Sequence, residues 1–120
     1  MRPFYDEELI EVDGEKLTLA IDFRAIDVIE GTVGEPMPSV LAQLFSTPAP
    51  LSLSGKVLWA LLLRHHDEVT VEEAAGLMFT EHANRVGLAM GGLLQRAFNL
   101  ADPKAKGKNP PKRPGASKPS

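Results

Sequence analysis

The sequence predicts a mainly helical α+β domain, made of an N-terminal β-hairpin and about five helices, followed by a disordered tail. An Asp-Gly pair separates two short runs of mixed apolar and polar residues near the N-terminus, which is the strongest short-range hairpin signal. Apolar residues then recur at helical spacing up to about residue 100. From residue 103 onward the chain is rich in Lys, Pro, Gly, Ala and Ser and cannot form a core. We therefore expect one domain over residues 1–102 and a disordered basic tail over residues 103–120.

The hairpin is expected over residues 7–21, because Asp13 and Gly14 suit a type I′ turn, which needs positive φ at both central residues. Asp22 is a plausible N-cap for a first helix that Gly31 and Gly34 end. The second strand should turn Leu17, Leu19 and Ile21 inward, and the helix should turn Phe23, Ile26, Ile29 and Val33 inward.

A short second helix is expected over residues 40–45, because prolines bracket it on both sides. Ser52 or Ser54 can cap a third helix. The centre of that helix, residues 57–63, is apolar on every side. It is therefore expected either to lie at the middle of the core or to be partly covered by a partner.

Thr70 and Glu73 predict a capping box that opens a fourth helix, which continues to Phe79. A longer fifth helix begins near Glu81, with Arg85, Gln95, Arg96 and Asn99 on its polar side. Its apolar stripe is Val86, Met90, Leu93, Leu94, Ala97 and Phe98. Each glycine inside a helix costs about 1 kcal/mol relative to alanine. Gly87 and Gly91 therefore suggest that another helix approaches closely. That helix belongs either to a partner or to this chain, and the second interpretation is preferred.

Composition argues against catalysis and against a resident cofactor. The chain has no cysteine, and it contains no nucleotide-binding glycine loop and no nucleophile motif. His65 and His66 are neighbours on a helix and diverge, and His82 has no partner one turn later. We therefore predict no catalytic residue, no cofactor and no metal site.

Charge divides between the two parts of the chain. All 16 acidic residues lie at or before Asp102, and six of the 13 basic residues lie after it, so residues 1–102 carry −9 and the tail carries +6. An acidic domain repels a phosphate backbone, which argues against specific nucleic-acid binding by the domain. No apolar run is long enough to cross a membrane, and the polar N-terminus lacks the features of a signal peptide, so we expect a cytoplasmic protein.

After a short hairpin, three segments resemble the tail assembly chaperones of long-tailed phages and gene transfer agents: LTLAIDFRAIDVIEGTVGEPMPSVLAQLF, LSLSGKVLWALLLRHHDEVTVEEAAGLM and VGLAMGGLLQRAF. The resemblance covers about residues 8–100, and its motifs are core and cap positions. The matching positions are Ile26, Ile29, Glu30, Gly34, Leu41, Leu44, Leu58, Trp59, Ala60, Leu61, His66, Thr70, Glu72, Glu73, Ala74, Leu77, Leu93, Leu94 and Phe98.

The resemblance implies a non-enzymatic protein that coats the hydrophobic tape measure protein during tail assembly in the host cytoplasm and is absent from the mature virion. It also implies the major tail tube protein as a second partner, and self-association or several copies on each tape measure. The expected contact residues lie on the third and fifth helices: Val57, Trp59, Leu61, Leu62, Gly87, Met90, Gly91, Leu94 and Phe98. The alternative is a small DNA-associated regulator in which helices four and five form a helix-turn-helix and the basic tail neutralises phosphates.

Overall fold

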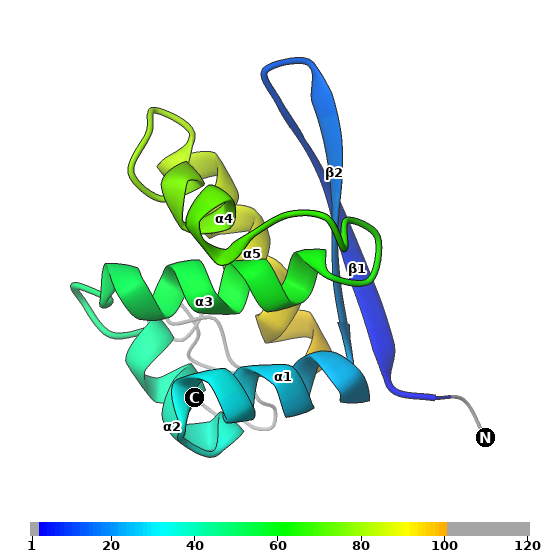
Figure 1. The fold of residues 1–120 in the computed structure, drawn as a ribbon. Helices are drawn as coiled ribbons and strands as arrows, with labels where there is room; N and C mark the ends of the chain where they lie inside the picture. The colour runs from blue at the N-terminus through cyan, green and yellow to red at the C-terminus, as the bar shows by residue number, and fades with distance from the viewer. Residues whose placement is uncertain (1–2, 101–120) are drawn as a thin grey trace, which may run out of the picture.

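The computed structural model describes residues 3–100 and contains a two-stranded antiparallel hairpin followed by five helices (Figure 1). The predicted α+β, mainly helical class is confirmed, whereas the predicted tail over residues 103–120 lies outside the described residues. The elements are β1 Tyr5–Val12, β2 Glu15–Asp22, α1 Phe23–Val33, α2 Met37–Leu44, α3 Leu51–Leu62, α4 Val71–Leu77 and α5 Ala83–Ala97.

The hairpin turns at the Asp-Gly pair, as the sequence predicts. Asp13 has φ of 53° and Gly14 has φ of 79°, so both central residues adopt the positive φ that a type I′ turn requires. Val12 pairs with Glu15 directly across the turn, and this register sets the pairing of the whole hairpin. The inward positions of β2 are confirmed, because all three side chains are at least nine-tenths buried: Leu17, Leu19 and Ile21.

Helix α3 lies at the middle of the domain, with α1 and α2 on one side of it and α4 on the other (Figure 1). This position explains why its sequence is apolar on every side. Val57, Leu58 and Leu61 are all completely buried. Among the helices described, none combines the length and the apolar character that crossing a bilayer requires.

Two of the predicted helix starts are confirmed. Asp22 caps α1 by accepting a hydrogen bond from the backbone N–H of Ala25 at 2.8 Å. The capping box of α4 is complete: the backbone N–H of Glu73 donates to the Thr70 hydroxyl at 3.1 Å, and the N–H of Thr70 donates to the Glu73 carboxylate at 2.9 Å.

Other helix boundaries differ from the prediction. Helix α2 begins at Met37, before the predicted residue 40, because a proline in the first turn of a helix needs no N–H partner. Helix α3 begins after Pro50, so neither predicted serine caps it. Ser54 lies inside α3 and donates its hydroxyl to the carbonyl of Pro50 at 3.1 Å. Helix α4 ends at Leu77, before Phe79.

The predicted inward face of α1 is wrong at Phe23, which is 76% exposed. The buried positions of α1 are Ala25 and Ile29, one turn apart. Phe23 lies two residues before Ala25 and therefore points to the opposite side of the helix. Ile26 and Val33 are half-buried against the core, as the pattern predicts.

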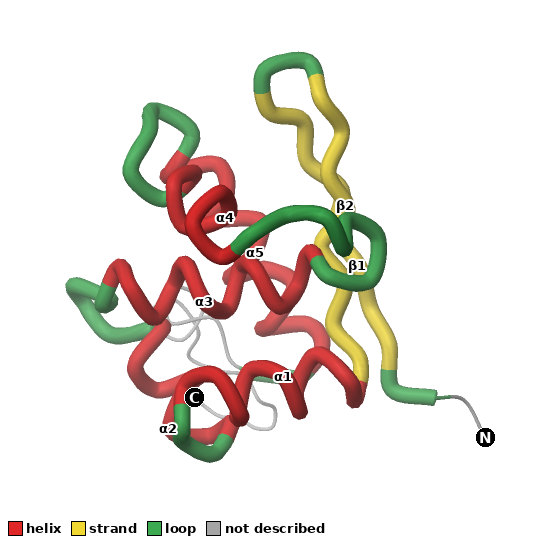
Figure 2. The backbone as a smooth tube through the Cα atoms, viewed as in Figure 1, coloured by secondary structure: helices red, strands yellow, loops and turns green. Residues whose placement is uncertain are grey.

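The hairpin lies along one side of the domain (Figure 2). Side chains from elsewhere in the fold bond to backbone groups on both of its outer edges. On the β1 edge, Arg85 of α5 donates to the carbonyl of Glu11, and Arg96 donates to the carbonyl of Glu7 at 3.0 Å. On the β2 edge, the N–H of Thr18 donates to Nε2 of His66 at 3.0 Å. Helix α5 is thus fixed along β1 by hydrogen bonds at both ends.

Candidate partner-binding groove

Four of the nine predicted contact residues lie together in one groove of about 400 Å³: Gly87, Met90, Gly91 and Leu94. All four belong to α5 and form the floor of the groove. The walls come from the end of α2, the loop after it, the first turn of α3 and the residue that ends α4. These other lining residues are Leu44, Phe45, Pro48, Ala49, Leu51, Ser54 and Met78.

The groove exists because two glycines leave one face of α5 without side chains. A Cβ built on Gly87 would meet no atom within 4 Å, and a Cβ on Gly91 would meet only the ring of Phe45, at 3.6 Å. Phe45, the residue that ends α2, lies with its ring over Gly91. The part of the groove over Gly91 is therefore partly filled by this ring, and the part over Gly87 is open.

The lining of the groove is almost entirely apolar. Among the described residues that line it, Ser54 alone has a polar side chain, and its hydroxyl already donates to Pro50. Phe45 and Leu51 expose 38% and 49% of their surface at the rim. Met78 and Met90 add flexible, polarisable side chains that adapt to differently shaped apolar groups. The groove can therefore hold apolar side chains but offers no group that could perform acid–base or nucleophilic chemistry.

The remaining predicted contact residues do not reach this surface. Val57, Leu61 and Leu62 of α3 are at most 1% exposed, so their side chains lie in the core of the described domain and not at its surface. Trp59 is half-buried and donates its indole N–H to the carbonyl of Val69 at 3.1 Å. Phe98 packs against the ring of Phe4, with 5.4 Å between the ring centroids.

The glycines behave differently from the preferred interpretation of the sequence. That interpretation places a neighbouring helix of the same chain against Gly87, but nothing in the described chain lies there. The close helix contact occurs at Gly55 of α3, where a Cβ would lie 2.7 Å from the Cβ of Ala75 on α4. Gly55 could not be identified from the sequence, because this glycine stands in the first half of an apolar helix and nothing nearby marks it as a contact.

Sequence reasoning also missed the walls of the groove. Leu44, Phe45, Leu51 and Met78 come from three separate parts of the chain and share no spacing pattern. The two prolines around Ala49 were the available signal, because they predict a rigid loop that holds its neighbours in place.

The arrangement of α4 and α5 does not support the alternative of a helix-turn-helix. Helix α4 packs against α3. Arg96 forms ion pairs with Asp6 at 3.3 Å and Glu8 at 2.9 Å, and these hydrogen bonds raise its pKa above the ordinary value. Arg85 is held on the carbonyl of Glu11. The two arginines of the proposed recognition helix are therefore occupied by the hairpin.

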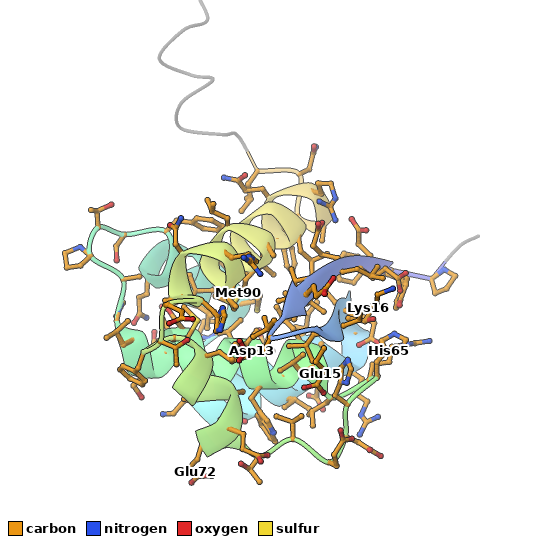
Figure 3. The ribbon with its side chains drawn as sticks, turned by 90° about the horizontal axis from the view of Figure 1, so that it is seen from above. Asp13, Glu15, Lys16, His65, Glu72 and Met90 are labelled. Carbon is orange, nitrogen blue, oxygen red and sulfur yellow. The ribbon has the colours of Figure 1, made fainter. Side chains whose placement is uncertain are left out.

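One group of side chains could in principle hold a metal ion. The ligand atoms of Asp13, Glu81 and His82 lie within 4.8 Å of one another, and Figure 3 shows Asp13 on the hairpin. However, Nε2 of His82 already contacts Asp13 at 3.1 Å, and the group lies at the positive N-terminal end of α5. Arg85 adds a further positive charge one turn along. The simpler interpretation is a polar contact that joins the hairpin turn to α5.

A second polar cluster lies at the other end of the hairpin. The phenol of Tyr5 donates to Glu7 at 2.5 Å, its oxygen lies 3.3 Å from Nε2 of His65, and the guanidinium of Arg64 lies 4.7 Å from its ring centroid. The hydrogen bond to Glu7 is the largest of the effects that raise the pKa of Tyr5 above its ordinary value. These side chains are exposed, so they form an open surface cluster and not an enclosed pocket.

A smaller cavity of about 170 Å³ lies near this cluster, between β2, α1 and the end of α3. Two of its charged groups, Arg64 and Asp22, form an ion pair at 2.7 Å. Asp22 also caps α1, so each of its two carboxylate oxygens already has a partner within the domain. The larger apolar groove is therefore the stronger candidate for function.

Comparisons of the chain with protein-family models, with curated proteins and with solved structures find no match. The family resemblance stated for the sequence therefore stays a prediction, and any function must be argued from the groove itself.

Proposed function

We propose that this protein is a non-enzymatic tail assembly chaperone that binds apolar segments of a tape measure protein in the groove above Gly87 and Gly91. The observation that carries the proposal is the groove itself, which is open, about 400 Å³ in volume and almost free of polar groups. An exposed apolar surface of this kind is typical of protein–protein contact sites. The proposal extends to the tail tube protein as a second partner, and to several copies of this chain on each tape measure.

The physical reasoning combines weak contacts with charge. A long hydrophobic partner needs many reversible apolar contacts, and each groove supplies one. Residues 3–100 contain 15 acidic and 6 basic side chains, a net charge of −9. Bound copies would therefore surround the partner with negative charge and oppose its aggregation.

Co-expression with a tape measure protein, followed by purification at low and at high salt, tests the proposal. We expect a complex at both salt concentrations, because apolar contacts tolerate salt, whereas phosphate contacts weaken steeply as salt rises. Leu51→Asp should abolish the complex, because Leu51 lines the groove. Leu88→Asp is the matched control, since Leu88 is a 70% exposed leucine outside the lining.

Two results would count against the proposal, the first against the chaperone function and the second against the groove as its binding site. One is the absence of any complex, together with salt-sensitive binding to a DNA duplex, which would favour the regulator. The other is an equal loss of binding in both leucine variants, which would place the contact outside the groove.

A further inference from the structure

We infer that the partner element bound in the groove is an α-helix that crosses α5 at Gly87 and carries lysine or arginine on both sides of an apolar stripe. The inference rests on the proposed function of the groove as a protein-binding site. It adds the chemical character of the bound segment, which the proposed function leaves open.

The lining of the groove selects an apolar stripe. A small-molecule site normally carries a few precisely placed polar groups that orient its ligand. Here the one polar side chain in the lining, Ser54, is already bonded to Pro50. The groove therefore suits the side chains of a peptide, whose polar backbone groups are satisfied within its own helix.

The shape of the floor selects a helix. At Gly55 and Ala75 this chain brings α3 and α4 together by leaving out a side chain. Gly87 offers the same kind of bare helix surface, but no neighbouring atom of the described chain lies within 4 Å of its Cβ position. A partner helix laid across Gly87 would contact α5 there in the same way that α4 contacts α3 at Gly55.

Charge complementarity favours a partner helix with lysine or arginine on both sides of its apolar stripe. The described residues carry a net charge of −9. Ion pairs at the hairpin join Arg64 to Asp22 and Arg96 to Asp6 and Glu8, which leaves 12 acidic and 4 basic side chains among the described residues. The domain as a whole therefore attracts a cationic partner and repels an anionic one, and an uncharged groove adds no charge that opposes this.

Charge and composition also argue against two other occupants. A second copy of this domain would bring another −9 to the contact. The segment over residues 103–120 is basic, but it contains no aromatic or branched aliphatic side chain that could fill the groove.

Two synthetic helical peptides of about 18 residues, or roughly five turns, provide the test. They share one stripe of leucine and alanine and differ only in carrying lysine or glutamate beside it. We expect the lysine peptide to bind the full chain at least about tenfold more tightly at low salt. The ratio should shrink as salt rises, because salt screens exposed charges. In amide NMR spectra, the largest shifts should occur at Gly87 and Gly91.

Gly87→Leu should abolish binding of the lysine peptide, because its side chain would occupy the groove. Gly92→Leu is the matched control, since Gly92 lies on the same helix, has no atom within 4 Å of its Cβ position and does not line the groove. Thermal melting of both variants checks that they fold. If Gly87→Leu fails to fold, Gly87→Ala replaces it, with Gly92→Ala as its control.

Equal affinity for the two peptides, tighter binding of the glutamate peptide, no binding of the lysine peptide, or shifts centred away from Gly87 would overturn the inference. A dimer of the free protein that Gly87→Leu dissociates would overturn it in favour of a second copy. The proposed function is decided separately, because the tape measure co-purification uses neither peptide.

Discussion

Gly55 of α3 and Ala75 of α4 are in such close contact that a side chain on Gly55 would have no room. A Cβ on Gly55 would lie 2.7 Å from the Cβ and 3.0 Å from the Cα of Ala75. The second of these atoms belongs to the backbone, so the clash cannot be relieved by a rotamer change. The packing of α4 onto the central helix depends on this one missing methyl group.

Gly55→Ala should therefore destabilise the protein. Overpacking typically costs about 1–3 kcal/mol. Because neither atom of Ala75 can move away by a rotamer change, we take the upper part of that range, about 2–3 kcal/mol, and the better helix propensity of alanine returns about 1 kcal/mol. We expect a net loss of roughly 1–2 kcal/mol in the free energy of unfolding, measured in urea. Ala75→Gly in the same chain should recover part of this loss, because it removes the 2.7 Å contact with the Cβ and leaves the 3.0 Å contact with the backbone Cα. A Gly55→Ala variant as stable as the wild type would mean that α3 and α4 separate easily.

Alanine at Gly87 and at Gly92 should have the opposite effect. Neither position has an atom within 4 Å of its Cβ site. Each substitution should raise the free energy of unfolding by about 0.5–1 kcal/mol, because alanine is the better helix former. Thermal melting of the two single variants and of the double variant measures this gain. A loss of stability at Gly87 alone would indicate that the groove is closed in solution.

Leu61→Ala should cost roughly 2–5 kcal/mol, because it leaves a cavity in a fully buried part of the core. Leu61→Asp should prevent folding, since a charge would be buried without a partner. Leu88→Ala is the control, since Leu88 is 70% exposed, and should change stability by less than about 0.5 kcal/mol. Urea unfolding compares the variants. Similar values for Leu61→Ala and Leu88→Ala would show that α3 is not central.

Tyr5 should ionise above its ordinary pKa of 10.0, because the phenol donates a hydrogen bond to the Glu7 carboxylate. A raised pKa favours the protonated form in the folded state. The contribution to stability is therefore present below pH 10 and is lost as the pH rises through the folded value. The chain has one tyrosine, so ultraviolet absorbance follows this group alone. Glu7→Ala should lower the midpoint towards 10.0, and Glu15→Ala, at the other end of the hairpin, should leave it unchanged.

Local signals in the sequence predicted local structure well. The Asp13-Gly14 turn and the Thr70–Glu73 capping box each depend on residues within a few positions of one another, and both are confirmed. The predicted start of α3 was wrong, because a serine before any helix is a possible cap, and Ser52 and Ser54 both fit that description. Pro50, which lacks an N–H, instead occupies the N-cap position.

The groove could be predicted only in part. The residues on α5 follow one helical face, so Gly87, Met90, Gly91 and Leu94 were found together. The walls depend on how the loop after α2 folds over α5, which no spacing in the sequence reveals. The sequence left open whether the apolar centre of α3 lies in the core or against a partner, because an all-apolar helix suits both, and in the structure Leu61 is buried in the core.

The covered edges of the hairpin affect how copies of this chain behave at high concentration. A two-stranded sheet with bare edges is a template on which further strands can add and fibrils can grow. Here the carbonyls of Glu7 and Glu11 and the N–H of Thr18 are already bonded to side chains from elsewhere in the fold. Crowded copies therefore cannot use these three backbone groups to add a strand, which makes continuous pairing along either edge of the hairpin less favourable.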